Sequence, residues 1–125
     1  MIPRYRAWDK EFKEMVQVDA LVFEEQIVKA TYKNGNVVKE DLKNYVLMQS
    51  TGLTDKNGKE IFEGDVVKMA KNVYSEPTCY EVVRHRGGAY RLDSKQYGCE
   101  LWLRHTDCEI AGNIYKNPEL LEVSS

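Results

Sequence analysis

Short β-prone segments separated by turn signals recur along the chain, and this spacing constrains its fold more than any other feature. Asn34-Gly35, Asn57-Gly58 and Arg86-Gly87-Gly88 interrupt stretches rich in valine, tyrosine and threonine, which are residue types enriched in strands. Segments that recur about every eight to twelve residues, with turns between them, are typical of an all-β barrel or sandwich. The sequence therefore predicts a mainly β protein.

The N-terminal residues predict a first hairpin. Two β-prone stretches between Ile2 and Phe23 flank the polar turn Asp9-Lys10-Glu11. A helix over residues 11–25 is the competing interpretation, but the β-branched Val16 and Val18 favour a strand.

A second hairpin is predicted around Asn34-Gly35. Both central positions of a type I′ turn need positive φ, which Asn and Gly tolerate best, so residues 27–33 and 36–39 are expected to pair. A single helical turn is expected within residues 40–45, followed by a buried strand over residues 45–48.

The second half of the chain predicts a small SH3-like barrel between about residues 61 and 115. A short helix over residues 117–122 follows, because Asn117 suits an N-cap and Pro118 suits the first helical position. The five strands of this barrel are predicted at residues 65–70, 79–84, 89–92, 100–104 and 109–115.

The whole chain, residues 1–125, is expected to be a single domain. It would comprise an N-terminal hairpin region over about residues 1–48, the barrel over about residues 49–116 and the helical turn. We expect the hairpins to pack on the barrel, because half of so short a chain would bury little surface alone. A second lobe is the alternative.

Composition narrows the function. Hydrophobic residues make up 42% of the 125 residues and charged residues 30%, with a net charge of −2. A nucleic-acid binder that relies on counterion release normally carries a strong basic bias. That bias is absent overall, although a folded patch could concentrate it.

The sequence also predicts where the protein works. No apolar run approaches the ~20 residues of a membrane span, and the N-terminus lacks the apolar core of a signal peptide. The three cysteines form an odd set at unmatched spacings, which suits a reducing compartment. We therefore expect a cytoplasmic protein with no membrane partner.

The cysteines and histidines supply ligand types for zinc, but no CxxC or HxxxH pair is present, and structural zinc sites are usually built on such close pairs. A Cys–His catalytic pair through Cys108 with His85 or His105 would need a base within hydrogen-bonding reach. We interpret the cysteines as buried thiols and the histidines as surface residues in turns. The sequence thus predicts no enzyme, no cofactor and no metal site.

The most distinctive local cluster is an arginine-rich hairpin with neighbouring aromatic residues. Guanidinium groups can bind phosphates and aromatic rings can stack on bases, as in proteins that bind single strands or loops. Against this interpretation, arginine and tyrosine are ordinary exposed strand residues, and Asp93, Glu100 and Asp107 offset the charge. The predicted contact residues, for nucleic acid or for a protein partner, are Arg84, Arg86, Tyr90, Arg91, Trp102 and Arg104.

Other polar and aromatic residues are interpreted as scaffold. Asp55 and Asp65 lie in turns, where an aspartate commonly accepts hydrogen bonds from backbone amides. Gly58 is expected to have positive φ in the first of these turns. Trp8 and Trp102 are expected to be core anchors or contacts between lobes, because each can bury a large area.

Three blocks of the sequence, in this order, resemble the YopX family of phage and prophage proteins. They are Arg4 to Asp9 followed by Met15, then Gln49 to Val67, and finally Gly112 to Tyr115 with Asn117 to Leu121. The resemblance implies a mostly β fold with an SH3-like barrel, a phage or prophage origin and a cytoplasmic role during infection or lysogeny. It implies no assigned activity, catalytic residue or cofactor.

The leading functional hypothesis is a non-enzymatic phage accessory protein that acts by binding a host or phage protein or by self-assembly, because exposed strand edges often pair with partners. The alternative is a nucleic-acid-binding module that uses the hairpin Arg84–Arg91. Residues 68–108 lie outside the three blocks, so the specificity of this chain is expected there.

Overall fold

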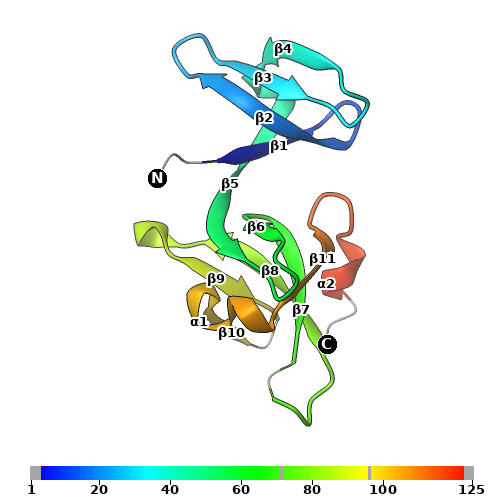
Figure 1. The fold of residues 1–125 in the computed structure, drawn as a ribbon, viewed down its shortest axis with the longest axis vertical. Helices are drawn as coiled ribbons and strands as arrows, with labels where there is room; N and C mark the ends of the chain where they lie inside the picture. The colour runs from blue at the N-terminus through cyan, green and yellow to red at the C-terminus, as the bar shows by residue number, and fades with distance from the viewer. Residues whose placement is uncertain (1–3, 71, 96, 123–125) are drawn as a thin grey trace. The chain divides into compact units, whose positions relative to one another are not determined.

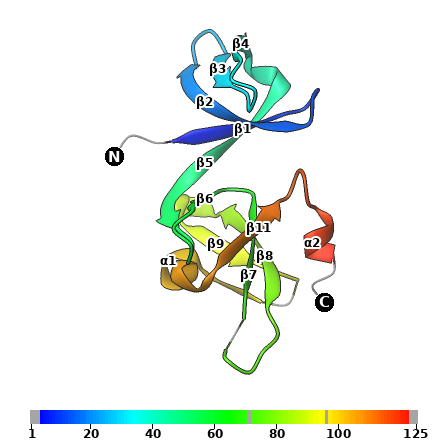
Figure 2. The ribbon, with the colours of Figure 1, turned by 45° about the vertical axis from the view of Figure 1, so that its right-hand side comes forward.

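The structure, a computed structural model, describes residues 4–70, 72–95 and 97–122. The chain divides into two compact units, Met1–Ser50 and Thr51–Ser125. Each unit is built on antiparallel strands (Figures 1 and 2). The prediction of a mainly β protein is confirmed.

The first sheet has the strand order β4-β3-β2-β1-β5-β6. Its strands are β1 (Tyr5–Asp9), β2 (Glu14–Val22), β3 (Ile27–Thr31), β4 (Val37–Asp41), β5 (Tyr45–Thr54) and β6 (Glu60–Phe62). β5 starts in the first unit and continues into the second, where β6 lies. The hairpin around residues 10–13 is confirmed, and a helix over residues 11–25 is wrong.

The first unit encloses a small core on one face of its sheet. The buried members of this core are Ala7, Val16, Val28, Ala30 and Tyr45. Alternate residues of a strand point to the same face, so Ala7 meets Val16 directly opposite it on β2. A bulge between Val18 and Ala20 shifts the pairing of β2 with β3, and such bulges bend a strand.

The second hairpin forms, but its turn type differs from the prediction. Gly35 has a φ of +90°, and its N–H donates to the carbonyl of Tyr32. Among the described residues other than glycine, only Lys13 and Gln26 have positive φ, so Asn34 does not, and the turn is not type I′. The side chain of Asn34 instead accepts a hydrogen bond from the N–H of Asn36, which supports a longer connection.

The second unit contains a five-stranded sheet with the order β10-β9-β8-β7-β11. Its strands are β7 (Asp65–Met69), β8 (Thr78–Arg84), β9 (Tyr90–Asp93), β10 (Gly98–Glu100) and β11 (Glu109–Asn113). Within the described parts of the chain this sheet is open, with β10 and β11 at its edges. An SH3-like barrel therefore stays a prediction.

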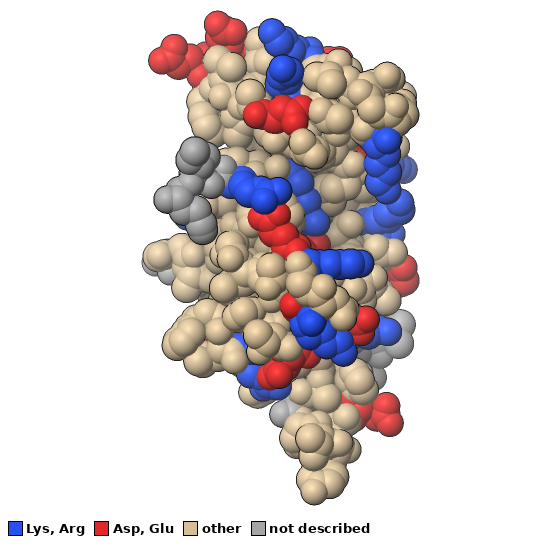
Figure 3. All heavy atoms as spheres, viewed as in Figure 1, with Lys and Arg blue, Asp and Glu red and all other residues tan. Residues whose placement is uncertain are grey.

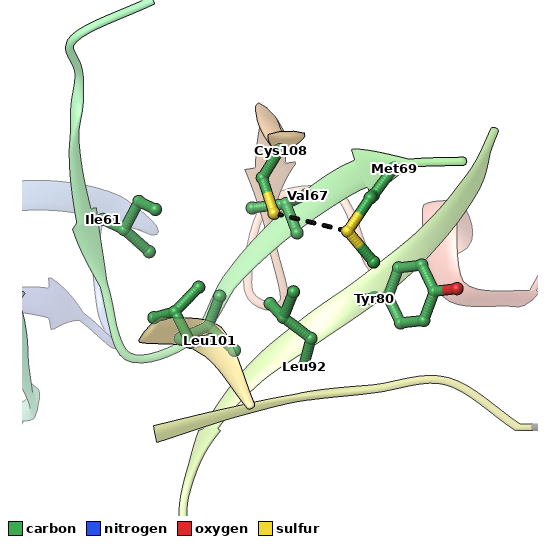
Figure 4. Packing of buried hydrophobic residues seen from close by; sticks show 8 residues of the cluster. Ile61, Val67, Met69, Tyr80, Leu92, Leu101 and Cys108 are labelled. Atoms are coloured by element: carbon green, nitrogen blue, oxygen red, sulfur yellow. Dashed lines mark hydrogen bonds between the residues drawn. The ribbon is translucent and has the colours of Figure 1, made fainter. Parts of the chain in front are cut away.

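A fully buried apolar cluster holds this second unit together (Figure 4). Tyr80 and Leu92 come from β8 and β9, while Leu101 and Cys108 come from the segments after β10. Each of these four residues is fully buried. Burial of side chains of this size contributes about 1.5–3 kcal/mol each, so this cluster is the main source of stability in the unit.

The helical segments are short: η1 (Leu42–Asn44), η2 (Arg86–Gly88), α1 (Leu101–Arg104), η3 (His105–Asp107) and α2 (Glu119–Glu122). The predicted turn within residues 40–45 and the predicted C-terminal helix are both confirmed. In the ranges that the structure describes, no helix has the length and apolarity to cross a membrane.

The predicted strand over residues 100–104 is wrong. Only its first residue is in β10, and Leu101–Arg104 forms α1. Leu101 is fully buried and Arg104 is partly buried, whereas Trp102 and Leu103 are exposed. This spacing is that of one helical face, where residues three apart are neighbours. The segment also lacks β-branched residues, and leucine and arginine favour helices.

Candidate functional site

The structure brings the predicted contact residues to the β8–β9 hairpin and α1, which packs against β9 and β10. Arg84 lies at the exposed end of β8. Tyr90 is partly buried and packs against the core of the second unit. Trp102 on α1 is 65% exposed, so the prediction that it anchors a core is wrong. The side chain of Arg86 lies outside the described part of the structure.

Carboxylates contact several of the basic side chains in this region. Arg91 forms a 2.7 Å hydrogen-bonded ion pair with Glu100 and lies 3.7 Å from Asp93. His85 lies 3.3 Å from the same Asp93. A guanidinium group that already has a carboxylate partner must give up that partner to bind a phosphate, so these pairs weaken the case for a phosphate-binding surface.

Arg104 connects α1 to the loop between β7 and β8. Its Nε donates to Asp107 at 2.9 Å, and its second guanidinium nitrogen donates to the carbonyl of Ala70 at 3.1 Å. Ala70 follows the last residue of β7. Arg104 is therefore a structural brace that fixes α1 against the base of the β7–β8 loop.

Four large apolar side chains are exposed on these two braced elements. Trp102 and Leu103 are 65% and 58% exposed on α1, and Val73 and Tyr74 are 90% and 96% exposed in the β7–β8 loop. We call these four residues the apolar surface. Figure 1 shows the loop extending beyond the ends of β7 and β8. Contiguous apolar patches often mark interaction sites, and the four residues form two pairs of neighbours in the chain, one on α1 and one in the loop.

The β7–β8 loop has internal hydrogen bonds that order its tip. The side-chain oxygen of Asn72 accepts from the N–H of Tyr74 at 2.8 Å and from the hydroxyl of Ser75 at 3.2 Å. The sequence identified a loop here but did not single out Val73 and Tyr74 as exposed apolar residues. The available signal was a Val-Tyr pair within an otherwise polar run.

The two turn aspartates serve the scaffold, as predicted. One carboxylate oxygen of Asp55 accepts from the N–H groups of Asn57 and Lys59, both at 2.9 Å. The other accepts from the N–H of Ile110 at 3.0 Å. Asp65 accepts from the N–H of Phe62 at 2.8 Å. Asp55 therefore ties the turn before β6 to β11.

Cys108 is a core residue, in agreement with its interpretation as a buried thiol. Its Sγ donates to the carbonyl of Arg104 at 3.3 Å and lies 3.9 Å from the sulfur of Met69 (Figure 4). Burial raises the pKa of this thiol to about 12, so it is protonated at neutral pH. Among the described residues, no three His, Cys, Asp or Glu side chains are grouped to hold a metal ion.

Positive and negative side chains alternate on the face drawn in Figure 3. This distribution agrees with the net charge of −2.

Comparisons with known proteins place the chain in a family. A family model described as YopX protein matches residues 4–122. The chain is 25% identical over 134 residues to the "SPbeta prophage-derived uncharacterized protein YopX" of Bacillus subtilis (strain 168), covering 94% of this chain and 95% of that protein.

Two crystal structures share the fold. Protein EF1440 from Enterococcus faecalis has 29% sequence identity and a TM-score of 0.67, with 97% of this chain and 99% of that chain covered. Protein YopX from Bacillus subtilis has 25% identity and a TM-score of 0.64, with 94% and 97% covered. Because the family model matches nearly the whole chain, this protein belongs to the YopX family.

Proposed function

We propose that the chain is a non-enzymatic accessory protein of phage or prophage origin that binds another protein in the cytoplasm of a bacterial host. The observation that carries this proposal is the exposure of Trp102 on α1, at 65%. Tryptophan is enriched among the residues that dominate binding energy at protein interfaces. Binding through the apolar surface needs no catalytic group or cofactor.

The surroundings of Trp102 suit a protein partner. Leu103 lies beside it, and the brace through Arg104 fixes α1 before any partner arrives. A preformed surface loses less conformational entropy on binding than a mobile one.

Nucleic-acid binding through the hairpin Arg84–Arg91 is the second candidate. Arg84 is the exposed cationic residue that favours it. The pairing of Arg91 with Glu100 and of Arg104 with Asp107 disfavours it. An SH3-like barrel in the second unit, with the N-terminal hairpins packed on it as part of one domain, would be compatible with either function.

A capture experiment separates the two candidates. The wild-type protein, Trp102→Ser and Arg84→Ala are immobilised, exposed to host-cell extract, and compared by quantitative mass spectrometry. We expect Trp102→Ser to reduce the captured amount of a specific protein partner at least about tenfold. Removal of an interface tryptophan often costs about 2 kcal/mol or more of binding free energy. Arg84→Ala is expected to retain that partner.

Fluorescence anisotropy with single-stranded DNA and RNA supplies the opposite readout. Tight binding that disappears in Arg84→Ala, with protein capture unaffected by Trp102→Ser, would overturn the proposal. Sedimentation of the purified protein tests self-assembly. A stable oligomer that dissociates in Trp102→Ser would identify a second copy of the chain as the partner.

A further inference from the structure

The first unit contains a pocket of about 440 Å³ that lies outside the apolar surface. It opens between the β1–β2 turn, the start of β2, the β3–β4 turn and β4. The pocket is lined by Phe12, Glu14, Tyr32, Asn34, Asn36, Val38 and Glu40. Its volume lies within the ordinary range for pockets that bind small groups.

The strand register explains how these side chains converge. Val38 is directly opposite Ala30, and Glu40 is directly opposite Val28; both opposing residues belong to the core of the first unit. Because alternate residues share a face, Val38 and Glu40 both point to the core side of the sheet. The pocket is therefore the place where this inner face changes from apolar to acidic.

A partly buried hydrogen-bond network fixes the tyrosine in the pocket lining. The Tyr32 hydroxyl donates to Asp9 at 2.5 Å and lies 2.7 Å from the hydroxyl of Tyr45. Asp9, which is only 3% exposed, also accepts from the N–H groups of Glu11 and Phe12. One carboxylate thus holds both Tyr32 and the turn that carries Phe12.

The charged side chains that line the pocket are both negative. Glu14 and Glu40 line it, and none of the described residues in its lining is basic. Burial, together with the negative charges of Asp9, Glu40 and Glu11, raises the pKa of Tyr45. Phe12 is 69% exposed, so most of its surface is accessible to a ligand.

We propose that this pocket binds the cationic side chain of a lysine or arginine presented by a partner protein. Carboxylates form strong charge-assisted hydrogen bonds with ammonium and guanidinium groups, and an aromatic face attracts the same cations. Glu14, Glu40 and Phe12 supply both kinds of interaction around one cavity. The pocket is independent of the apolar surface, so either site can exist without the other.

Nuclear magnetic resonance titration tests the pocket with defined probes. The probes are N-acetyl-arginine methylamide and N-acetyl-lysine methylamide, and the neutral control is N-acetyl-norleucine methylamide. We expect the amide signals of Phe12, Tyr32 and Glu40 to shift with either cationic probe at about 20 mM, a concentration suited to a weak single-group contact. The norleucine probe is expected to cause no such shift.

Variants assign the binding to the proposed residues. Glu14→Gln, Glu40→Gln and Phe12→Ala are each expected to weaken binding of the cationic probes about two- to fivefold. Glu24→Gln, which removes an exposed carboxylate from the β2–β3 turn, is the matched control and is expected to leave binding unchanged. Unshifted signals elsewhere in the first unit confirm that each variant remains folded.

Three outcomes would overturn the inference. They are equal shifts with the norleucine probe, no shift of the pocket signals with either cationic probe, and unchanged binding in both glutamine variants. If Glu14→Gln alters the fold, Glu40→Gln decides the result, because Glu40 is exposed on β4.

Discussion

The two units of the chain differ in how they obtain their stability. The second unit has a core cluster of eight buried residues, including Tyr80, Leu92 and Leu101. The first unit has a cluster of five, of which two are alanines. Because burial energy scales with apolar area, we expect the second unit to be the more stable of the two. The apolar surface lies on the unit with the larger core, and the acidic pocket lies on the other.

Truncation of a core side chain should give the largest loss of stability, and the size of that loss should differ between the two units. Leu92→Ala is expected to destabilise the second unit by about 2–5 kcal/mol, because it removes a fully buried leucine and leaves a cavity. Val28→Ala is expected to cost the first unit about 1–2 kcal/mol, because it removes less volume. Hydrogen exchange measured by mass spectrometry reports each unit separately; an equal or larger loss from Val28→Ala would contradict the ranking.

Asparagine substitutions compare the buried aspartates of the two units. Asp55→Asn is expected to cost about 1–3 kcal/mol, because all three of its protein partners are N–H donors and the new amide group must face one of them. Asp9→Asn is expected to cost under about 1 kcal/mol. Its amide can donate to Tyr32 while its oxygen still accepts from Glu11 and Phe12.

Urea unfolding monitored by circular dichroism measures both aspartate variants. Similar losses in Asp55→Asn and Asp9→Asn would show that partner chemistry does not distinguish the two sites. Asp55→Ala is a useful third variant, because it leaves all three N–H groups without this acceptor.

Gly58→Val should destabilise the second unit by about 1–3 kcal/mol. Gly58 has a φ of +80°, and a Cβ placed there would meet no atom within 4 Å, so the cost comes from the backbone alone. Gly35 in the first unit has a φ of +90° and equally open space. Gly35→Val is therefore the matched comparison, and we expect it to have a similar cost. Thermal unfolding of both variants checks this prediction; unchanged stability of Gly58→Val would contradict it.

Acid should produce a smaller, pH-dependent loss of folding stability in the second unit. Burial alone favours the protonated form of Asp55, but the N–H donors of Ile110, Lys59 and Asn57 outweigh it and lower its pKa. A lowered pKa stabilises the folded protein above the unfolded value of about 3.9, and that stability disappears as pH falls through the folded pKa. The difference in stability between wild type and Asp55→Asn should shrink below about pH 4. A constant difference would contradict this linkage.

Removal of a surface ion pair should have the smallest effect. Arg91→Gln breaks the contact with Glu100, and both side chains are about one-third exposed, at 31% and 35%. We expect a loss of about 0.5–1 kcal/mol and unchanged capture of a protein partner. If Arg91→Gln no longer captured the partner, the arginines rather than the apolar surface would be the binding residues.

The sequence predicted most strands because valine-rich segments alternate with turn residues whose backbone needs are specific. The Asn34-Gly35 signal located a hairpin but not its turn type, since the side chain of Asn34 bonds to the backbone of Asn36 and changes the connection. The segment Leu101–Arg104 was missed because four residues cannot establish a period. The burial of Leu101, which the sequence alone does not show, accompanies a helical turn there.

The candidate site was less predictable than the fold. Sequence placed Arg84, Arg91 and Trp102 near one another, but it could not show that Glu100 pairs with Arg91. The exposure of Tyr74 and the acidic pocket depend on long-range packing and strand register. The pocket leaves no local pattern, because Glu14 and Glu40 are far apart in the chain and meet only through the sheet. For Tyr74 the only local signal is the Val73-Tyr74 pair in a polar run.

The salt dependence of partner binding tests the apolar surface most directly. Once a partner is captured and purified, its Kd is measured at about 50 mM and about 500 mM salt, for wild type and for Trp102→Ser. An apolar interface predicts a Kd that changes little with salt and rises at least about tenfold in Trp102→Ser. A Kd that rises about a thousandfold in high salt and is unchanged in Trp102→Ser would contradict the account. That result would identify charge contacts as the basis of binding.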